Sequence, residues 1–347
     1  MRPSPFRLGA AGDTRIGRRE HDEDGVLVRA DLGLFAVADG AGGHASGRVA
    51  SRLTLGTIVR RFEASAQSHA EGAPFDVLGL PAGAKRLSLA VHAANAEVVA
   101  LASKSEQHSG MASTVVAIYV ETARGLVHVA HVGDSRCYRL RGPFLELLTQ
   151  DHSLANDVLE LTPHLPEARA RELPSRVVTR ALGMEKNVRV SLQTHAIDAK
   201  DRFLLCSDGL TDELDEEQIA AALQQTLRPD ALVKLLFDVA NADEAADNAA
   251  ALVVDVKGEA SRGAPAPALR ERRPRGSMSL PPTPEGRWGD EGSGGARVDE
   301  GDRRVPSMIA GVLSPGMRDD LALHRCPQCG APLVAPGAPC EVCGYGK

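Results

Sequence analysis

The chain has 347 residues, of which 43% are hydrophobic, and its 46 acidic and 40 basic residues give a net charge of −6. This composition can build one large domain or two smaller ones. The first 250 positions hold no dominant basic block and the chain has no run of 18 apolar residues, which argues against a nucleic-acid-binding protein and a transmembrane helix. The N-terminal residues have no apolar core of a signal peptide, so we expect a cytoplasmic protein that does not bind membranes.

Residues 1–256 alternate apolar runs with short polar turns. Runs rich in Val, Leu and Ile predict strands, and apolar residues spaced for one helical face predict helices. In chain order we expect strands at 26–29 and 34–38, helices at 46–62 and 84–101, strands at 114–120, 126–132, 136–140, 189–194 and 203–206, helices at 216–225 and 229–240, and a strand at 250–256. Because these elements are grouped rather than strictly alternating, we expect an α+β fold with antiparallel sheets covered by helices.

Two changes in composition divide the rest of the chain. Residues 257–321 are rich in Gly, Pro, Arg and Ser and hold few large apolar side chains, which predicts a flexible linker. Within it, Ser277, Ser279 and Thr283 lie among arginines and prolines, and their phosphorylation is a hypothesis. Residues 322–347 form a third, small unit.

The six cysteines are of two kinds. Cys137 and Cys206 stand alone in apolar runs, and we expect them to be reduced and buried. The other four form two C-x-x-C-G motifs separated by ten residues, namely Cys326, Cys329, Cys340 and Cys343. Four thiolates suit one structural Zn²⁺, and a unit of this size needs a bound metal or another cross-link to fold. A disulfide pair or an iron site is the alternative, and the unit resembles a zinc-ribbon fragment.

Aspartates border four of the predicted strands. They are Asp39, followed by Gly40, then Asp134, Asp208 and Asp247. A single Asp-Gly pair is common in turns and indicates little by itself. Four carboxylates that converge need cations to offset their repulsion, and their hard oxygen ligands suit Mg²⁺ or Mn²⁺. Two such ions can activate a water molecule for attack on phosphorus.

A polar segment near the N-terminus carries Arg19 just before Glu23 and Asp24. The planar guanidinium group of an arginine can donate paired hydrogen bonds to a phosphate group. From composition alone, a solvated loop is the simpler interpretation.

Taken together, these residues resemble the bacterial form of the protein phosphatase 2C family, also called PPM-type phosphatases. The matching motifs follow the family's order at 19–24, 37–44, 110–114, 131–138, 148–154, 179–183, 205–211 and 247–248. The resemblance implies a four-layer α/β/β/α sandwich of two antiparallel sheets flanked by helices. It also implies direct hydrolysis of phosphoserine and phosphothreonine in proteins, opposing bacterial serine/threonine kinases. Its partners would be phosphoproteins, a kinase or its substrates, and we expect a monomer.

The resemblance assigns a role to each candidate residue. Asp39 would bridge two Mn²⁺ or Mg²⁺ ions beside the Gly40 carbonyl, with Asp208 and Asp247 completing the first metal site. Asp134 and Asp208 would bind a third ion. Arg19 would grip the phosphate, and Glu23 and Asp24 would act mostly through metal-bound water. The catalytic set is therefore Arg19, Asp39 and Asp208.

Several positions depart from the family pattern. Asp22 stands where the family usually has Asn, and Ala41 where it has Met or His, so the general acid is unassigned. His44 is a weaker candidate for that acid, and the segment 154–175 is atypical for the family's mobile flap. Two alternatives to an active enzyme follow: a pseudophosphatase that binds phosphoproteins without hydrolysing them, and an adaptor that acts mainly through its zinc knuckle.

Overall fold

The computed structural model describes residues 6–42, 46–71, 75–76, 79–104, 106–170, 172–174 and 176–258. Several predictions lie outside these residues: most of the linker with Ser277, Ser279 and Thr283, the unit 322–347 with Cys326, Cys329, Cys340 and Cys343, and His44.

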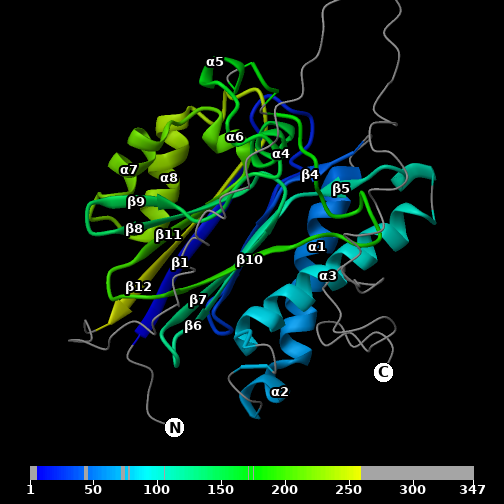
Figure 1. Ribbon diagram of the computed structural model, residues 1–347. Helices are drawn as coiled ribbons and strands as arrows, with labels where there is room; N and C mark the ends of the chain where they lie inside the picture. The colour runs from blue at the N-terminus through cyan, green and yellow to red at the C-terminus, as the bar shows by residue number, and fades with distance from the viewer. Residues whose placement is uncertain are drawn as a thin grey trace, which may run out of the picture. The chain divides into compact units, whose positions relative to one another are not determined.

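Two five-stranded antiparallel sheets form the centre of the domain (Figure 1). The first sheet has the order β1 (Phe6–Arg15), β12 (Ala249–Gly258), β11 (Arg202–Cys206), β8 (Arg136–Arg141) and β9 (Phe144–Leu147). The second has the order β10 (Ser191–Ala196), β7 (Leu126–Val132), β6 (Val115–Glu121), β3 (Leu34–Ala38) and β2 (Gly25–Arg29). A short pair, β4 (Gly40–Ala41) with β5 (Ala112–Ser113), lies at one end.

Helices cover the outer face of each sheet (Figure 1). The second sheet is covered by α1 (Ser46–Ala64) and α3 (Ala82–Ala102), with α2 (Ala66–Glu71) beside them, and the first by α7 (Glu216–Leu223) and α8 (Pro229–Ala240). Shorter helices are η1 (Glu106–His108), α4 (Leu154–Leu161), α5 (Glu167–Ala170) and α6 (Asp208–Thr211). This arrangement confirms the predicted α/β/β/α sandwich.

Local sequence explains where these helices begin and end. Asp215 and Gln218 form a capping box at the start of α7. α8 starts with Pro229, whose fixed φ suits the first helical turn, and ends at Asn241 in the left-handed conformation.

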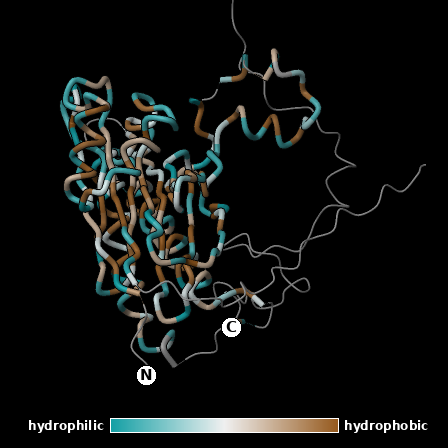
Figure 2. Tube along the Cα trace, turned by 90° about the vertical axis from the view of Figure 1, so that its left-hand side faces the viewer, coloured by the Kyte–Doolittle hydropathy of each residue, from teal (hydrophilic) through white to brown (hydrophobic). Residues whose placement is uncertain are grey.

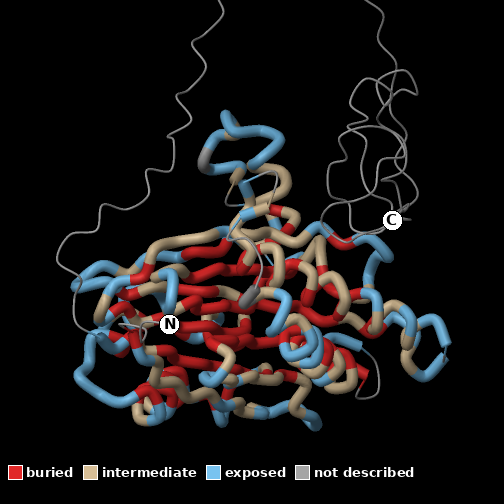
Figure 3. The backbone as a smooth tube through the Cα atoms, turned by 90° about the horizontal axis from the view of Figure 1, so that it is seen from below, coloured by how far each residue is buried: buried red, intermediate tan, exposed pale blue. Residues whose placement is uncertain are grey.

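Alternating side chains divide the core into three apolar layers. In β3, Phe35 and Val37 lie between the sheets, whereas Leu34 and Ala36 face α1 and α3. β12 shows the same alternation, because Leu252 and other even-numbered residues enter the layer between the sheets. The central strands therefore carry apolar side chains on both faces. The hydrophobic segments concentrate in the interior of the domain in Figure 2, and buried segments run through it in Figure 3.

All predicted elements are present, with ends shifted by a few residues, but the sequence did not predict the strands β1 and β9 or the short elements β4, β5, α2, α4, α5, α6 and η1. The sequence did not predict β1 because glycines and charged residues interrupt its apolar pattern. In the structure β1 is stabilised by pairing with β12 over its full length. Cys137 and Cys206 are free and buried, as expected, and burial raises the pKa of the Cys206 thiol to about 12. Of the described helices, none combines the length and apolar character that crossing a bilayer requires.

Candidate active site

The predicted acidic residues gather at one end of the sandwich. β3 and β11 end there and β12 begins there, because neighbouring strands are antiparallel. Asp39 follows β3, Asp208 opens α6 directly after β11, and Asp247 precedes β12. In Figure 1 this is the end that carries β4, β5 and α4 to α6.

Four carboxyl groups in this region lie close enough to perturb one another's protonation, namely those of Asp24, Asp39, Asp134 and Asp208, which we call the carboxylate cluster. Burial raises the pKa of Asp24 to about 7, with the charge of Asp208 acting in the same direction. Burial and then the charge of Asp24 raise the pKa of Asp39 well above its ordinary value. Burial and Asp208 raise the pKa of Asp134 to about 6. Such shifts mark a site that favours added positive charge.

The cluster fits divalent cations by its chemistry. Asp24 is 7% exposed, and its Oδ1 is buried without a hydrogen-bond partner. After burial, the charges of Asp24 and Asp208 contribute to the raised pKa of Asp39, and a cation placed between these carboxylates would offset their repulsion. Among the described residues, no three acidic, His or Cys side chains stand grouped closely enough to enclose an ion as they are. The donor set is therefore suitable for Mg²⁺ or Mn²⁺, with side-chain adjustments on binding.

Glu23 and the Gly40 carbonyl, both predicted ligands, meet beside Gly47 at the start of α1. A Cβ atom at Gly47 would lie 2.4 Å from the Gly40 carbonyl oxygen and 2.7 Å from Glu23 Oε2. A Cβ atom at Gly40 would lie 2.0 Å from the Gly47 carbonyl oxygen. Both positions therefore require glycine, because the backbone segments at Gly40 and Gly47 lie too close together for a side chain. Gly47 was not identified from the sequence.

Neutral side chains fix the acidic residues in place. Ser207 Oγ donates a 2.7 Å hydrogen bond to Asp24 Oδ2 and accepts one from the Ala250 backbone. Asn248 Oδ1 accepts a hydrogen bond from the Glu23 N–H at 3.0 Å, while its Nδ2 donates to the Ile16 carbonyl at 2.7 Å. The sequence pattern indicated no role for Ser207 or Asn248, although each is adjacent to a predicted aspartate.

The turn after β3 is fixed in the same way by Thr114, which lies between β5 and β6. Thr114 Oγ1 accepts a hydrogen bond from the Asp39 N–H at 3.2 Å, and the Thr114 N–H donates to the Asp39 carbonyl at 2.8 Å. Thr114 Oγ1 also lies 2.7 Å from Ser135 Oγ, next to Asp134. Thr114 therefore ties the turns that carry Asp39 and Asp134 to each other.

Arg19 lies at the edge of this site. Its Nη2 lies 2.5 Å from Asp247 Oδ2, and its Nε donates to the Ala246 carbonyl. Both side chains of the ion pair are about half exposed, at 55% and 46%. Arg19 and Asp247 were predicted to contact phosphate and metal, and the structure brings them together.

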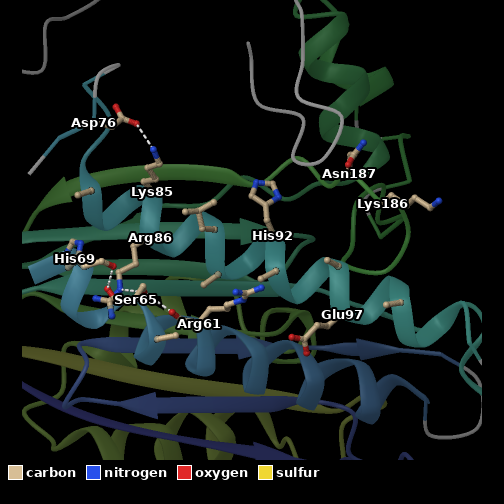
Figure 4. Close-up of a pocket in the computed structure, with 18 of the residues that line it drawn as sticks. Arg61, Ser65, His69, Asp76, Lys85, Arg86, His92, Glu97, Lys186 and Asn187 are labelled. Carbon is tan, nitrogen blue, oxygen red and sulfur yellow. Dashed lines mark hydrogen bonds and ion pairs between the residues drawn. The ribbon is translucent and has the colours of Figure 1, made fainter. Parts of the chain in front are cut away.

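A groove with a volume of about 1170 Å³ lies elsewhere, on the outer face of α1 and α3 (Figure 4). Its polar residues pair with one another: Lys85 Nζ lies 3.8 Å from Asp76, and Arg86 Nε donates to Ser65. None of the predicted site residues lines this groove, so it is separate from the acidic site.

Comparison with known proteins gives a consistent result. The family model described as protein phosphatase 2C matches residues 11–250. The serine/threonine phosphatase stp of Listeria monocytogenes is 32% identical over 244 residues, covering 70% of this chain and 92% of that protein. The serine/threonine protein phosphatase PstP of Mycobacterium tuberculosis is 33% identical over 253 residues, covering 72% of this chain and 45% of that protein.

Solved structures agree with these relatives. The catalytic domain of PstP in complex with two manganese ions superimposes with a TM-score of 0.60 at 30% identity, covering 73% of this chain and 99% of that one. The phosphatase MsPP of Mycobacterium smegmatis, in complex with cacodylate, gives a TM-score of 0.58 at 32% identity, covering 71% of this chain and 97% of that one.

Proposed function

The chain belongs to the protein phosphatase 2C family and is a metal-dependent serine/threonine protein phosphatase, and we propose that its carboxylate cluster is the catalytic centre. The observation that supports this most is that burial, and then the charges of neighbouring carboxylates, raise the pKa values of Asp24, Asp39 and Asp134, so that added positive charge is favoured there. Two divalent ions at this end are consistent with the two manganese ions of the PstP structure.

We propose the following roles for the site residues. Asp39 and the Gly40 carbonyl hold a pair of Mn²⁺ or Mg²⁺ ions, together with Asp208 and Asp247. Asp134 and Asp208 hold a third ion. Glu23 and Asp24 support the cluster, mainly through metal-bound water, and Ser207 keeps Asp24 oriented.

The bound ions would supply a water molecule of lowered pKa and neutralise phosphate charge. The protein's own part is to orient the reactants. Arg19 would bind the phosphoryl oxygens through its guanidinium group, which is half exposed and within reach of substrate. On substrate binding, Arg19 would release Asp247 and contact the phosphate group instead. Asp247 would then be free to bind metal, so that phosphate binding and metal binding would favour each other.

The residue that protonates the leaving alcohol is unassigned, because Ala41 has no proton to donate. The alternative functions, a phosphoprotein-binding pseudophosphatase and an adaptor, remain the competing hypotheses. The complete set of predicted carboxylates favours the enzyme over both.

A direct test measures release of phosphate from a phosphothreonine peptide by the purified full chain, with and without Mn²⁺. We expect activity that requires Mn²⁺ and is lost in Asp208→Asn, whereas Glu63→Gln, which removes an exposed ion pair with Arg29, leaves it unchanged. A folded wild-type chain that binds Mn²⁺ and hydrolyses nothing would favour the pseudophosphatase.

For the remainder of the chain we propose a domain organisation from its sequence. Residues 257–321 would link the phosphatase domain (residues 1–256) to a unit at 322–347 in which Cys326, Cys329, Cys340 and Cys343 bind one structural Zn²⁺. We further propose a cytoplasmic monomer that acts on a serine/threonine kinase or its substrates. Zinc content per chain, measured in wild type and in Cys326→Ser, tests the knuckle, and unchanged partners after deletion of 322–347 would exclude the adaptor.

A further inference from the structure

The backbone turn that carries Asp134 is held by the side chain of a histidine. Gly133 N–H donates a 3.1 Å hydrogen bond to His152 Nδ1, and the His152 N–H donates to the Gly133 carbonyl at 2.9 Å. Gly133 has a φ of +107°, and a Cβ atom there would lie 2.6 Å from the Thr114 side chain. The turn is thus bound by His152 on one side and closely bordered by Thr114 on the other.

The ring of His152 is itself fixed on every side. Its Nε2 lies 2.8 Å from Ser191 Oγ, and it stacks on His131 at 4.6 Å between ring centroids with an 18° interplanar angle. His131 Nε2 in turn lies 2.8 Å from the Gln150 carbonyl oxygen. Burial, followed by the neighbouring His131, lowers the pKa of His152 to about 3, so the ring is neutral and its Nδ1 can accept the Gly133 hydrogen bond.

His152 also stands where the segment 154–176 leaves and rejoins the domain. The next residue, Ser153, caps α4 through its side chain. Where the chain returns, Thr179 N–H donates to the His152 carbonyl at 2.9 Å, and Leu154 N–H donates to the Val177 carbonyl at 2.8 Å. Both ends of this segment are therefore attached next to the His152 ring, which holds the turn that carries Asp134.

We propose that His152 is a positioning residue that acts through the Gly133 backbone to aim the Asp134 carboxylate at the metal ion which Asp134 and Asp208 would share. This inference rests on the proposed function. It assigns to the ring a task that a merely space-filling residue would not have, because the geometry requires an acceptor at the position of Nδ1.

Two substitutions separate that acceptor from the rest of the ring. In His152→Asn the side-chain amide can place its oxygen near the position of Nδ1, whereas in His152→Gln the amide reaches the position of Nε2 and leaves Gly133 N–H without its acceptor. Binding of Mn²⁺ to the full chain is measured by the electron paramagnetic resonance signal of free Mn²⁺. Phosphothreonine peptide hydrolysis is titrated with Mn²⁺ in parallel.

We expect His152→Gln to weaken the weakest-bound Mn²⁺ about tenfold and His152→Asn to weaken it much less. The double variant His152→Gln/Asp134→Asn should bind Mn²⁺ no more weakly than Asp134→Asn alone, because both changes act on one ligand. Ser191→Ala, which removes only the far support of the ring, should shift Mn²⁺ binding in the same direction by a smaller factor, and it serves if His152→Gln does not fold.

Equal Mn²⁺ binding in wild type and His152→Gln, or in wild type and Ser191→Ala if the former is unfolded, would overturn the inference. So would equal losses in the Asn and Gln variants, or additive losses in the double variant. These results are distinct from failure of the proposed function, which would appear as absence of Mn²⁺-dependent hydrolysis by the wild-type chain itself.

Discussion

Glu121, at the end of the sandwich opposite the carboxylate cluster, is the centre of a buried ionic network whose contribution to stability can be worked out. The residue is 7% exposed at the end of β6. Arg124 Nη1 donates to Glu121 Oε1 at 2.7 Å, His69 Nε2 lies 3.0 Å from the same oxygen, and His128 Nε2 lies 3.3 Å from Oε2. The network thereby joins α2 to the hairpin of β6 and β7.

Replacing Glu121 with Gln should destabilise the folded chain in a pH-dependent way. Burial alone would raise the pKa of Glu121, but hydrogen bonds with His128 and His69 and the charge of Arg124 outweigh it and lower the pKa from 4.5 to about 2. Since one pKa unit corresponds to about 1.4 kcal/mol, the ionised carboxylate stabilises the fold by about 3 kcal/mol near neutral pH. A lowered folded-state pKa means that this stabilisation is present above pH ~4.5 and disappears as the pH falls toward 2.

The assay is urea unfolding of wild type and Glu121→Gln at pH 7 and pH 3. The difference in free energy of unfolding should be about 3 kcal/mol at pH 7 and about 1 kcal/mol at pH 3. Glu172→Gln, which removes an exposed ion pair with Arg169, is the matched control and should cost under ~0.5 kcal/mol at both. An equal cost of Glu121→Gln at the two pH values would refute the reasoning, because the loss would then come from packing.

Three further predictions concern the catalytic end. Because the pKa of Asp39 is raised by burial and by Asp24, Asp39→Asn should raise the thermal midpoint of the metal-free chain and abolish the stabilisation that Mn²⁺ gives the wild type, as calorimetry would show; a lower midpoint would contradict this. Gly47→Ala should reduce kcat at least tenfold, because its Cβ would displace the Gly40 carbonyl and Glu23, and wild-type kinetics in this variant would argue against those two ligands. Ser207→Ala should weaken Mn²⁺ affinity about tenfold by releasing Asp24, whereas Ser68→Ala on α2 should leave it unchanged.

The apolar pattern predicted antiparallel sheets covered by helices, whereas the four-layer arrangement and the acidic end of the sandwich were implied by the family resemblance. Strands such as β3 are continuous apolar runs, and an aspartate at the end of such a run has its position determined by the strand itself. That is why Asp39 and Asp208 could be assigned to strand ends, whereas their meeting at one end of the sandwich depends on the order and direction of the strands.

The residues that orient these aspartates could not be predicted in the same way, because their partners are far away in the chain. Ser207 reaches Asp24 across 183 positions, and Asn248 reaches Glu23 across 225. Such contacts depend on the order of strands in the sheets, which periodicity does not reveal. β1 was missed for a related reason, since its stability comes from pairing with β12 rather than from its own composition.

Asp22, the departure from the family pattern that favoured a binding-only protein, has a local explanation in the structure. Its Oδ2 accepts a hydrogen bond from Thr14 Oγ1 at 2.5 Å, and its Oδ1 accepts one from the Asp24 N–H at 3.2 Å. An asparagine could keep the contact with Thr14 only if the threonine hydroxyl accepted a hydrogen bond from the amide nitrogen, whereas the aspartate accepts from both donors. The added charge does raise the pKa of Asp24, after burial and Asp208, which strengthens the preference of the cluster for cations. Asp22 is therefore compatible with an active metal centre, and Ala41 is left as the one departure that removes a chemical group from the reaction.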